Sequence, residues 1–500
     1  MVFFAKPLST FQLAIAGIAL AHAGSLLAWY VPQLSLPILV GLFGVTLWTS
    51  TRYPSAALVV LMVELAIGSK GHLFAIELAG LSVSLRMVLF SGCLIGWLLR
   101  RVLKNKTSVL PETIRWTIYL LFTILAWAVG RGFGHFAPAA VYLDVNGWLY
   151  WLLVFPIADG LRTRQQLEQL RSALLAATTW VAAETVVALI IFSNGLAVIG
   201  GSLYHWLRDS GLGEITHVSG TIFRVFIQSQ LFVLVGFFLA LGLIIFYERQ
   251  RQGTIALKTY CYVWLCSLAI VISQSRSFWI GLVVGVVLLL ALGIWTKHLD
   301  WRRSTVTIAL LAVLTIADVL LLNLFTRNFT GNPLLERLTG LQTEAAASSR
   351  MNQLRPLSEA IRVQPMLGYG FGKELTYVSS DPRVLAKNPS GLYTTSAFEW
   401  GYLDILLKIG LLGLGIYLFF LTLALWPTKN LLSSTTATDE DKGVAAGLAA
   451  AAVAVLITNV FSPYLNHPLG IGFALLLLVS LRILASPRPK EKPPKATLGE

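Results

Sequence analysis

The chain has 500 residues, of which 56% are apolar and only 12% are charged, and its formal net charge is +14. Soluble domains carry about 25% charged residues, so this composition, with a mean hydropathy of +0.73, excludes a soluble globular protein and predicts an integral membrane protein. The excess of Lys and Arg is expected to set the membrane topology and to attract anionic lipid headgroups. It does not indicate nucleic-acid binding.

Apolar runs of about 20 residues are typical of membrane-spanning helices, and the chain has fourteen candidates. They cover residues 11–30, 35–49, 55–68, 83–99, 114–130, 147–158, 173–192, 226–247, 259–273, 278–296, 304–325, 402–426, 443–460 and 467–485. The runs at 55–68 and 147–158 are short enough to be tilted, re-entrant or interfacial. We therefore predict an all-α fold, a polytopic transmembrane helix bundle of about 12–14 spans with one large outward-facing, partly helical loop.

Loop charges predict the orientation of these spans. Short loops rich in Lys and Arg stay in the cytoplasm, and all such loops fall on one side of the fourteen-span arrangement. Both termini are then cytoplasmic. The expected organisation is an N-terminal transmembrane bundle over 1–325, the large outward-facing loop over 326–401, C-terminal spans over 402–485 and a disordered cytoplasmic tail over 486–500.

Residues for metal or nucleotide chemistry do not gather in the sequence. Cys93, Cys261 and Cys266 lie inside predicted spans and have no metal-binding spacing with histidines. The glycine-rich run 368–372 lacks the preceding strand and the following Lys-Ser/Thr of a phosphate-binding loop. It predicts instead a turn that brings the backbone close to a ligand or to the membrane surface. We expect no metal and no cofactor.

Two arginines stand at the predicted outer membrane boundary. Arg276 lies in the short turn 273–277 between two apolar runs, and Arg224 stands at the start of the run 226–247. An arginine at such a depth is costly unless it reaches headgroups or a partner in a protein-lined cavity. Because guanidinium groups bind phosphate bidentately and keep their charge, both are candidates for a diphosphate clamp. Snorkelling to headgroups is the alternative.

The outer loop contains a predicted helix over 345–363. Arg355, Glu359 and Arg362 share one face of it, although Pro356 is also compatible with a helix that begins there. The spacing suits substrate binding, and it suits an ordinary solvated face with an Arg–Glu pair slightly better.

Several carboxylates are placed where acid–base chemistry is possible. Glu399 precedes the span 402–426 and is a candidate general base, or an acid that caps the following helix. Three further acids, each a candidate proton-relay residue or interhelical hydrogen bonder, lie inside predicted spans: Glu64, Glu184 and Asp318.

In order and spacing, these motifs resemble the O-antigen ligase and O-antigen polymerase superfamily of bacterial inner-membrane proteins. The resemblance covers roughly residues 215–425. It rests on Arg224, the Ser-Arg-Ser turn at 273–277, a loop helix with Arg350, the Pro-x-x-Gly-x-Gly turn at 365–370, Tyr402-Leu403 and the Gly-Leu-Leu-Gly stretch at 410–413.

The resemblance implies a metal-independent glycosyltransferase of the bacterial inner membrane, either an O-antigen ligase or a polysaccharide polymerase, with a periplasmic active site. Such an enzyme transfers a glycan from undecaprenyl diphosphate to an acceptor sugar hydroxyl in surface polysaccharide or lipopolysaccharide biosynthesis. Its partners would be the undecaprenyl-diphosphate-linked donor, a glycan or lipid A-core acceptor, and membrane lipids.

Site roles follow from the same resemblance. Glu399 and Arg276 are expected to be catalytic, and the expected substrate-binding residues are Arg224, Arg350, Arg355 and Arg362. The family often has a His-Asn pair where this chain has Glu399-Trp400. Either Glu399 replaces the histidine as base or acceptor-orienting group, or the chain represents a divergent branch. The alternatives from other classes are a multi-span transporter or flippase of a lipid-linked saccharide, and a non-catalytic assembly partner.

Overall fold

The computed structural model describes residues 9–78, 81–104, 110–246, 254–327 and 345–487. Helices dominate the described chain. The first half contains α1 (Thr10–Tyr30), α2 (Ser35–Arg52), α3 (Pro54–Ile67), α4 (Leu85–Lys104), α5 (Glu112–His135), α6 (Pro138–Trp148), α7 (Val154–Gly160), α8 (Arg164–Ser193) and α9 (Ala197–Asp209), with short 3-10 turns at Pro32–Leu34 and Leu149–Leu153.

The second half continues with α10 (Gln230–Phe246), α11 (Thr254–Ile272), α12 (Arg276–Trp295), α13 (Trp301–Thr326), α15 (Ala345–Val363), α16 (Pro382–Leu385), α17 (Gly401–Ser433), α18 (Asp439–Phe461) and α19 (Pro468–Ala485). Each of the fourteen predicted apolar runs is thus helical along most of its length. The short run at 147–158 is part of a longer, broken segment, because α6 and the 3-10 turn precede α7 without a loop.

The described residues hold ten helical segments that are long and apolar enough to cross a membrane. Three shorter apolar helices accompany them, Pro54–Ile67, Gln230–Phe246 and Leu257–Ile272. The remaining predicted span is α4, which carries basic residues at both ends. The predicted polytopic α-helical bundle is therefore confirmed, while the finer count of 12–14 spans stays a prediction.

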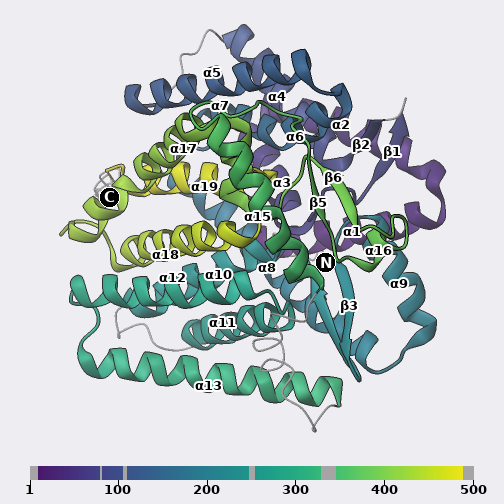
Figure 1. The fold of residues 1–500 in the computed structure, drawn as a ribbon. Helices are drawn as coiled ribbons and strands as arrows, with labels where there is room; N and C mark the ends of the chain where they lie inside the picture. Colours follow the sequence, from purple (N-terminus) through teal and green to yellow (C-terminus); the bar gives the residue numbers. More distant parts are fainter. Residues whose placement is uncertain (1–8, 79–80, 105–109, 247–253, 328–344, 488–500) are drawn as a thin grey trace, which may run out of the picture.

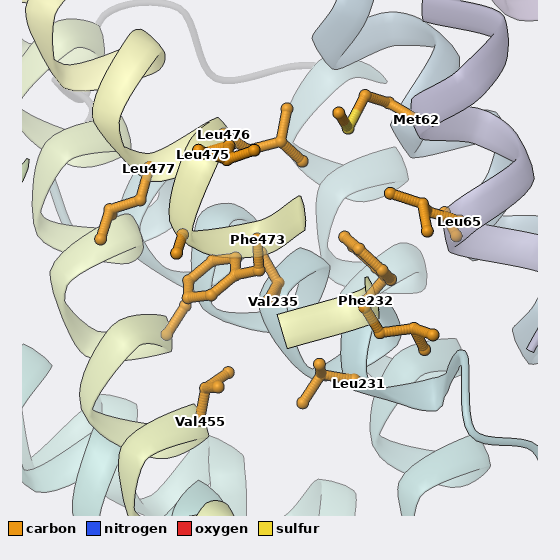
Figure 2. Packing of buried hydrophobic residues seen from close by; sticks show 14 of the residues in the cluster. Met62, Leu65, Leu231, Phe232, Val235, Val455, Phe473, Leu475, Leu476 and Leu477 are labelled. Carbon is orange, nitrogen blue, oxygen red and sulfur yellow. The ribbon is translucent and has the colours of Figure 1, made fainter. Parts of the chain in front are cut away.

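A continuous apolar core joins the two halves of the chain. Figure 2 shows apolar side chains of α3, α10, α18 and α19 turned toward one another, among them Met62, Leu65, Leu231, Phe232, Val235, Val455 and Phe473. A helix that is apolar on all sides belongs in the interior, and α19 is such a helix, with most of its length buried. The equally apolar α13 lies at the edge of the bundle and presents most of its surface outward (Figure 1).

Glycines let the central helices approach one another closely. A Cβ atom at Gly447 of α18 would lie 2.6 Å from the Phe238 carbonyl oxygen of α10, and one at Gly281 of α12 would lie 2.6 Å from the Ala454 carbonyl oxygen of α18. Small residues at helix interfaces allow such backbone contact. The Gly- and Ala-rich sequence of α18 thus makes it the common partner of α10 and α12.

Three antiparallel hairpins gather at one end of the bundle, together with α9 and α16, as Figure 1 shows on its right-hand side. They are formed by β1 (Ala75–Leu78) and β2 (Leu81–Ser84), β3 (Glu214–Ser219) and β4 (Ile222–Phe226), and β5 (Leu375–Val378) and β6 (Leu392–Thr395). These strands are a small addition that the all-α prediction did not contain. We call the end of the bundle that holds these three hairpins the hairpin end.

Basic residues collect at the opposite end. Arg164 lies 2.7 Å from Asp441 and donates to the Leu484 carbonyl, while Arg171 lies 2.8 Å from Glu440. These contacts join the start of α8 to the start of α18 and the end of α19. The gathering of positive charge at one end agrees with the predicted topology, although which side of the membrane this end faces stays a prediction.

The predicted loop helix has the expected bounds. Pro356 lies inside α15, so the alternative that the helix begins at this proline is wrong. Pro356 removes one backbone hydrogen bond, but Leu357 beside it is fully buried against Phe398 and Leu407, and this packing holds α15 to α17. Parts of two predicted regions, 328–344 of the loop and 488–500 of the tail, lie outside the described residues.

Candidate active site

Arg224 projects from the β3–β4 hairpin at the hairpin end. The sequence placed it at the start of a span, but the structure places it within β4, opposite Thr216, and α10 begins only at Gln230. Its Nε donates to the Ser273 carbonyl oxygen at 2.9 Å, and its guanidinium lies 4.7 Å from the centre of the Phe226 ring. The hairpin thus carries Arg224 to the turn that precedes α12.

That turn, 273–277, is fixed by its own serines. The Ser275 and Ser277 hydroxyls lie 3.0 Å apart, and Ser277 reaches the Ser462 hydroxyl at 3.1 Å. The serines therefore stabilise the turn against the end of α18, and the turn places Arg276 at the first position of α12. Gln274 adopts a φ of 47°. Its buried amide has no hydrogen-bond partner among the described residues, which is unusual for a buried polar group.

Arg350 and Glu399 form an ion pair between α15 and the segment before α17. The Trp400 indole donates to the Arg350 carbonyl oxygen at 2.8 Å, and the Gln353 side chain accepts from the Glu399 backbone N–H at 3.1 Å. Glu399 makes no capping bond to α17, whose N-cap is Trp400. The capping alternative for Glu399 is therefore not what the structure shows, and its carboxylate faces an arginine instead.

The three arginines of this end interact electrostatically. Burial lowers the pKa of Arg224, Glu214 opposes this effect, and the positive charges of Arg350 and Arg276 lower the pKa further. The charges of Arg276 and Arg350 also act on each other. Because a guanidinium stays protonated under all ordinary conditions, this cluster is a concentration of fixed positive charge. We call Arg224, Arg276 and Arg350 the arginine cluster.

Arg355 and Arg362 occupy a different surface. Both side chains are exposed on α15, and Arg355 pairs with Glu359 at 2.9 Å. Within the described chain, no hydrogen bond or ion pair joins either residue to the arginine cluster. This is the solvated Arg–Glu face that the spacing favoured, and such a pair contributes little to stability.

The glycine-rich turn packs against protein backbone. Its N–H groups at Tyr369 and Gly370 donate to the carbonyls of Leu407 and Lys408 in α17, at 2.8 and 3.0 Å, and the Phe371 N–H donates to Ala128 of α5 at 3.1 Å. The close approach that the glycines indicate is therefore made to the backbone of α5 and α17, while an approach to a ligand or to the membrane surface stays a prediction. The glycines are needed because the turn lies between two helices, where a Cβ at Gly370 would be 2.7 Å from the Ala128 carbonyl oxygen.

Helix α17 breaks where it receives this turn. Gly410 has a φ of 64° and a ψ of −171°, and the N–H groups of Leu411 and Leu412 donate to the carbonyls of Pro365 and Met366 at 2.9 and 3.0 Å. The turn thus supplies hydrogen-bond acceptors for N–H groups that lose their helical partners at the break. This junction fixes the first part of α17 and, through it, the position of Glu399.

Gly410→Ala is expected to lower the free energy of unfolding by about 1–3 kcal/mol, because a non-glycine residue is strained at this positive φ and its Cβ would contact the Met366 carbonyl. Thermal unfolding of the purified protein in detergent measures the effect. Gly415→Ala is the matched control, since Gly415 lies in the same helix with open space around its Cβ position. Equal unfolding temperatures for the two variants would contradict a tight junction.

A buried ionic cluster lies beside the junction. The Lys408 ammonium is 2.9 Å from carboxylate oxygens of both Asp144 and Asp404, and all three side chains are at most 4% exposed. Asp144 also accepts from the Gly372 N–H at 2.7 Å, and Asp404 accepts from Asn466 at 2.5 Å. The cluster ties α6, α17, the glycine-rich turn and the segment before α19 together.

Asp404 and Lys408 lie four residues apart on one helix, a spacing that is visible in the sequence, but no sequence pattern links Asp144 to them. Asp144 and Lys408 are 264 positions apart, and nothing in the local pattern links them. The one sequence signal for Asp144 is that it is a lone acid in the apolar stretch before the run 147–158.

The acids inside predicted spans are paired across helices. Asp318 accepts from Ser267 at 2.5 Å, and the other two acids face a basic partner each, Glu64 with Arg86 at 3.0 Å and Glu184 with His22 at 3.5 Å. This favours interhelical bonding over the proton-relay interpretation. Among the described residues, no group of three or more His, Cys, Asp and Glu side chains is placed to hold a metal ion.

Fold and site together define a polytopic helical membrane protein with an arginine cluster and a paired carboxylate at one end of its bundle. Residues 261–418, about a third of the chain, match the family described as O-antigen ligase. The chain therefore carries an O-antigen ligase family region, which confirms the resemblance seen in its motifs. The match includes Arg276, Arg350 and Glu399, whereas Arg224 lies before it. A search of curated proteins gave no match.

Proposed function

We propose that this protein is a periplasm-facing, lipid-linked glycan transferase of the O-antigen ligase or polymerase type. It would take a glycan from undecaprenyl diphosphate and pass it to an acceptor sugar hydroxyl, on another glycan or on a lipid A-core. The protein would lie in the bacterial inner membrane with both termini in the cytoplasm.

The observation that carries this proposal is the convergence of Arg224, Arg276 and Arg350 from three distant parts of the chain. A lipid diphosphate is a leaving group whose negative charge grows as the glycosidic bond breaks. Preorganised cations at that position stabilise the transition state, and guanidinium groups match phosphate oxygens bidentately. The cluster therefore offers charge stabilisation through side chains alone.

Glu399 completes the proposed chemistry. The acceptor hydroxyl oxygen attacks the anomeric carbon of the donor glycan, the bond from that carbon to the diphosphate oxygen breaks, and undecaprenyl diphosphate leaves with the bonding electrons. Glu399 takes the hydroxyl proton or orients the hydroxyl. In this structure the Glu399 carboxylate pairs with Arg350. A diphosphate that binds Arg350 would therefore release this carboxylate to contact the acceptor hydroxyl.

Arg355 and Arg362 fit a separate role in this scheme. Their exposed position on α15 suits contact with the sugar part of a substrate that approaches from solvent, and we assign them to the glycan rather than to the diphosphate. Substitution at either position should then change transfer less than substitution in the arginine cluster.

The cellular test is the size of lipid-linked saccharides in cells that lack this protein, measured by gel and mass spectrometry. Single repeat units accumulating on undecaprenyl diphosphate would identify a polymerase, and long chains accumulating on that carrier would identify a ligase. An unchanged pool would contradict both activities and favour a transporter or an assembly partner.

A further inference from the structure

A polar cavity lies at the basic end of the bundle. It has a volume of about 380 Å³ and lies where α2, α4 and α7 end and where α3 and α8 begin. The residues that characterise it are Arg52, Trp97, Arg100, Arg101, Asp159 and Arg162. Four cationic side chains thus line a hollow that contains a single carboxylate.

That carboxylate does not neutralise the cavity. Asp159 accepts from the Trp97 indole at 2.9 Å and pairs with Arg162 at 3.0 Å and with Arg101 at 3.5 Å. Arg52 and Arg100 have no carboxylate partner among the described residues. The Nη1 atom of Arg100 is buried and lacks a hydrogen-bond partner within the same residues. A buried guanidinium nitrogen normally has an acceptor, so this donor points to an anion.

The cavity is separate from the arginine cluster. Helix α3 begins at Pro54, which lines the cavity, and ends at Ile67. Just beyond the end of α3, the Ser69 hydroxyl accepts from the backbone N–H of Gln228 at 2.8 Å. Gln228 follows soon after Arg224 in the chain, so this end of α3 lies beside the segment that carries Arg224. Fourteen helical residues span about 21 Å. The two arginine-rich sites therefore lie at opposite ends of the bundle.

Aromatic side chains place the cavity at the level of a membrane interface. Trp97 stacks on Phe155, and the guanidinium of Arg101 lies 5.3 Å from the Trp97 ring centre. Tyr53 also lines the cavity and is exposed beside Trp48. Trp and Tyr gather where spans meet the headgroup region. An anion held here is therefore within reach of lipid headgroups as well as of solvent.

We propose that this cavity binds the phosphate group of an anionic ligand, on the membrane face opposite the candidate active site. Arginine forks match phosphate geometry bidentately, and the excess of three positive charges among the named residues suits a phosphodiester or phosphomonoester. The phosphate belongs either to a phospholipid of that leaflet or to a soluble phosphorylated molecule. The proposal does not depend on the transferase activity.

The test is binding to the purified full-length protein in detergent, measured by native mass spectrometry. The probes are dioctanoyl phosphatidylglycerol, dioctanoyl phosphatidylcholine and glycerol phosphate. The variant Arg100→Gln/Arg101→Gln is expected to weaken binding of the anionic probe at least about tenfold, because it removes two charge-assisted contacts to the phosphate. The matched control is Arg302→Gln/Arg303→Gln, which removes two exposed arginines from the same basic end and should leave binding unchanged.

The probe that binds identifies the source of the phosphate. Tight binding of phosphatidylglycerol that glycerol phosphate does not displace means a lipid headgroup, and displacement by glycerol phosphate means a soluble ligand. Equal binding by the cavity variant and the control variant would overturn the proposal, as would equal binding of the anionic and the zwitterionic lipid.

Asp159→Asn provides an independent test that does not remove a cavity arginine. Asparagine retains an oxygen for the Trp97 indole but releases Arg101 and Arg162 from a competing negative charge. Binding of the anionic probe should tighten at least about threefold, by the Coulomb attraction of an added net charge in a partly buried site. Unchanged or weaker binding in a variant that elutes and unfolds like the native protein would contradict the proposal.

Discussion

Arg276→Ala is expected to lower glycan transfer by about 10²–10³-fold while leaving the protein folded and inserted. Loss of one preorganised donor to a developing anion typically has an effect of this size. The serine turn that positions Arg276 is held by hydroxyl contacts among Ser275, Ser277 and Ser462, which do not involve the arginine side chain. The measurement is the rate of transfer by membranes with matched protein levels.

The control for this prediction is Arg383→Ala. Arg383 lies in α16 at the same hairpin end and, like Arg276, carries a positive charge, but its side chain is exposed and pairs with Asp381, the N-cap of α16. Its removal should change transfer by less than about twofold, since surface pairs contribute little. Normal transfer by the Arg276 variant, or an equal loss in the Arg383 variant, would contradict the diphosphate clamp.

Lys408→Met is expected to lower the free energy of unfolding by about 3–5 kcal/mol. Removing one partner from a buried ionic cluster leaves an uncompensated charge, and here two carboxylates, Asp144 and Asp404, would remain buried without their cation. Because Asp144 also holds the Gly372 N–H, the glycine-rich turn should loosen as well. Thermal unfolding in detergent and protease sensitivity of the segment 345–400 measure both effects.

Lys429→Met is the matched control, because Lys429 lies on the same helix with an exposed side chain. It should unfold like the native protein. Adding Asp144→Asn to Lys408→Met removes one of the two uncompensated charges, and this double variant should regain part of the lost stability. A Lys408 variant as stable as the native protein would show that the cluster does not hold the junction.

Much of the bundle could be predicted from apolar run length, because a chain in lipid must satisfy its backbone internally and helices do so locally. The bounds of α15 followed in the same way from a local pattern. The β3–β4 hairpin was missed because its strands are only six and five residues long and continue directly toward the apolar α10. Arg224 was consequently placed in a span rather than in the hairpin.

The site could be predicted only where one short segment carries the signal. Arg276 and Glu399 are candidates because of their place next to apolar runs, but the contact of Glu399 with Arg350 depends on how α15 packs on α17. The partners of the glycine-rich turn could not be predicted either. The glycines of the turn indicate a close approach to some neighbour, but they do not say which one. The positive φ of Gly410, where α17 breaks, likewise depends on tertiary contacts with residues more than forty positions away along the chain.

Glycan transfer by the purified protein in lipid nanodiscs tests the proposed activity directly. The protein is supplied with an undecaprenyl-diphosphate-linked oligosaccharide and, in a parallel reaction, with lipid A-core as well, both in the presence of a metal chelator. We expect free undecaprenyl diphosphate together with an extended or transferred glycan, and we expect both to be lost in Arg276→Ala. A donor that remains intact in both reactions, with the protein folded, would contradict the proposed transferase activity.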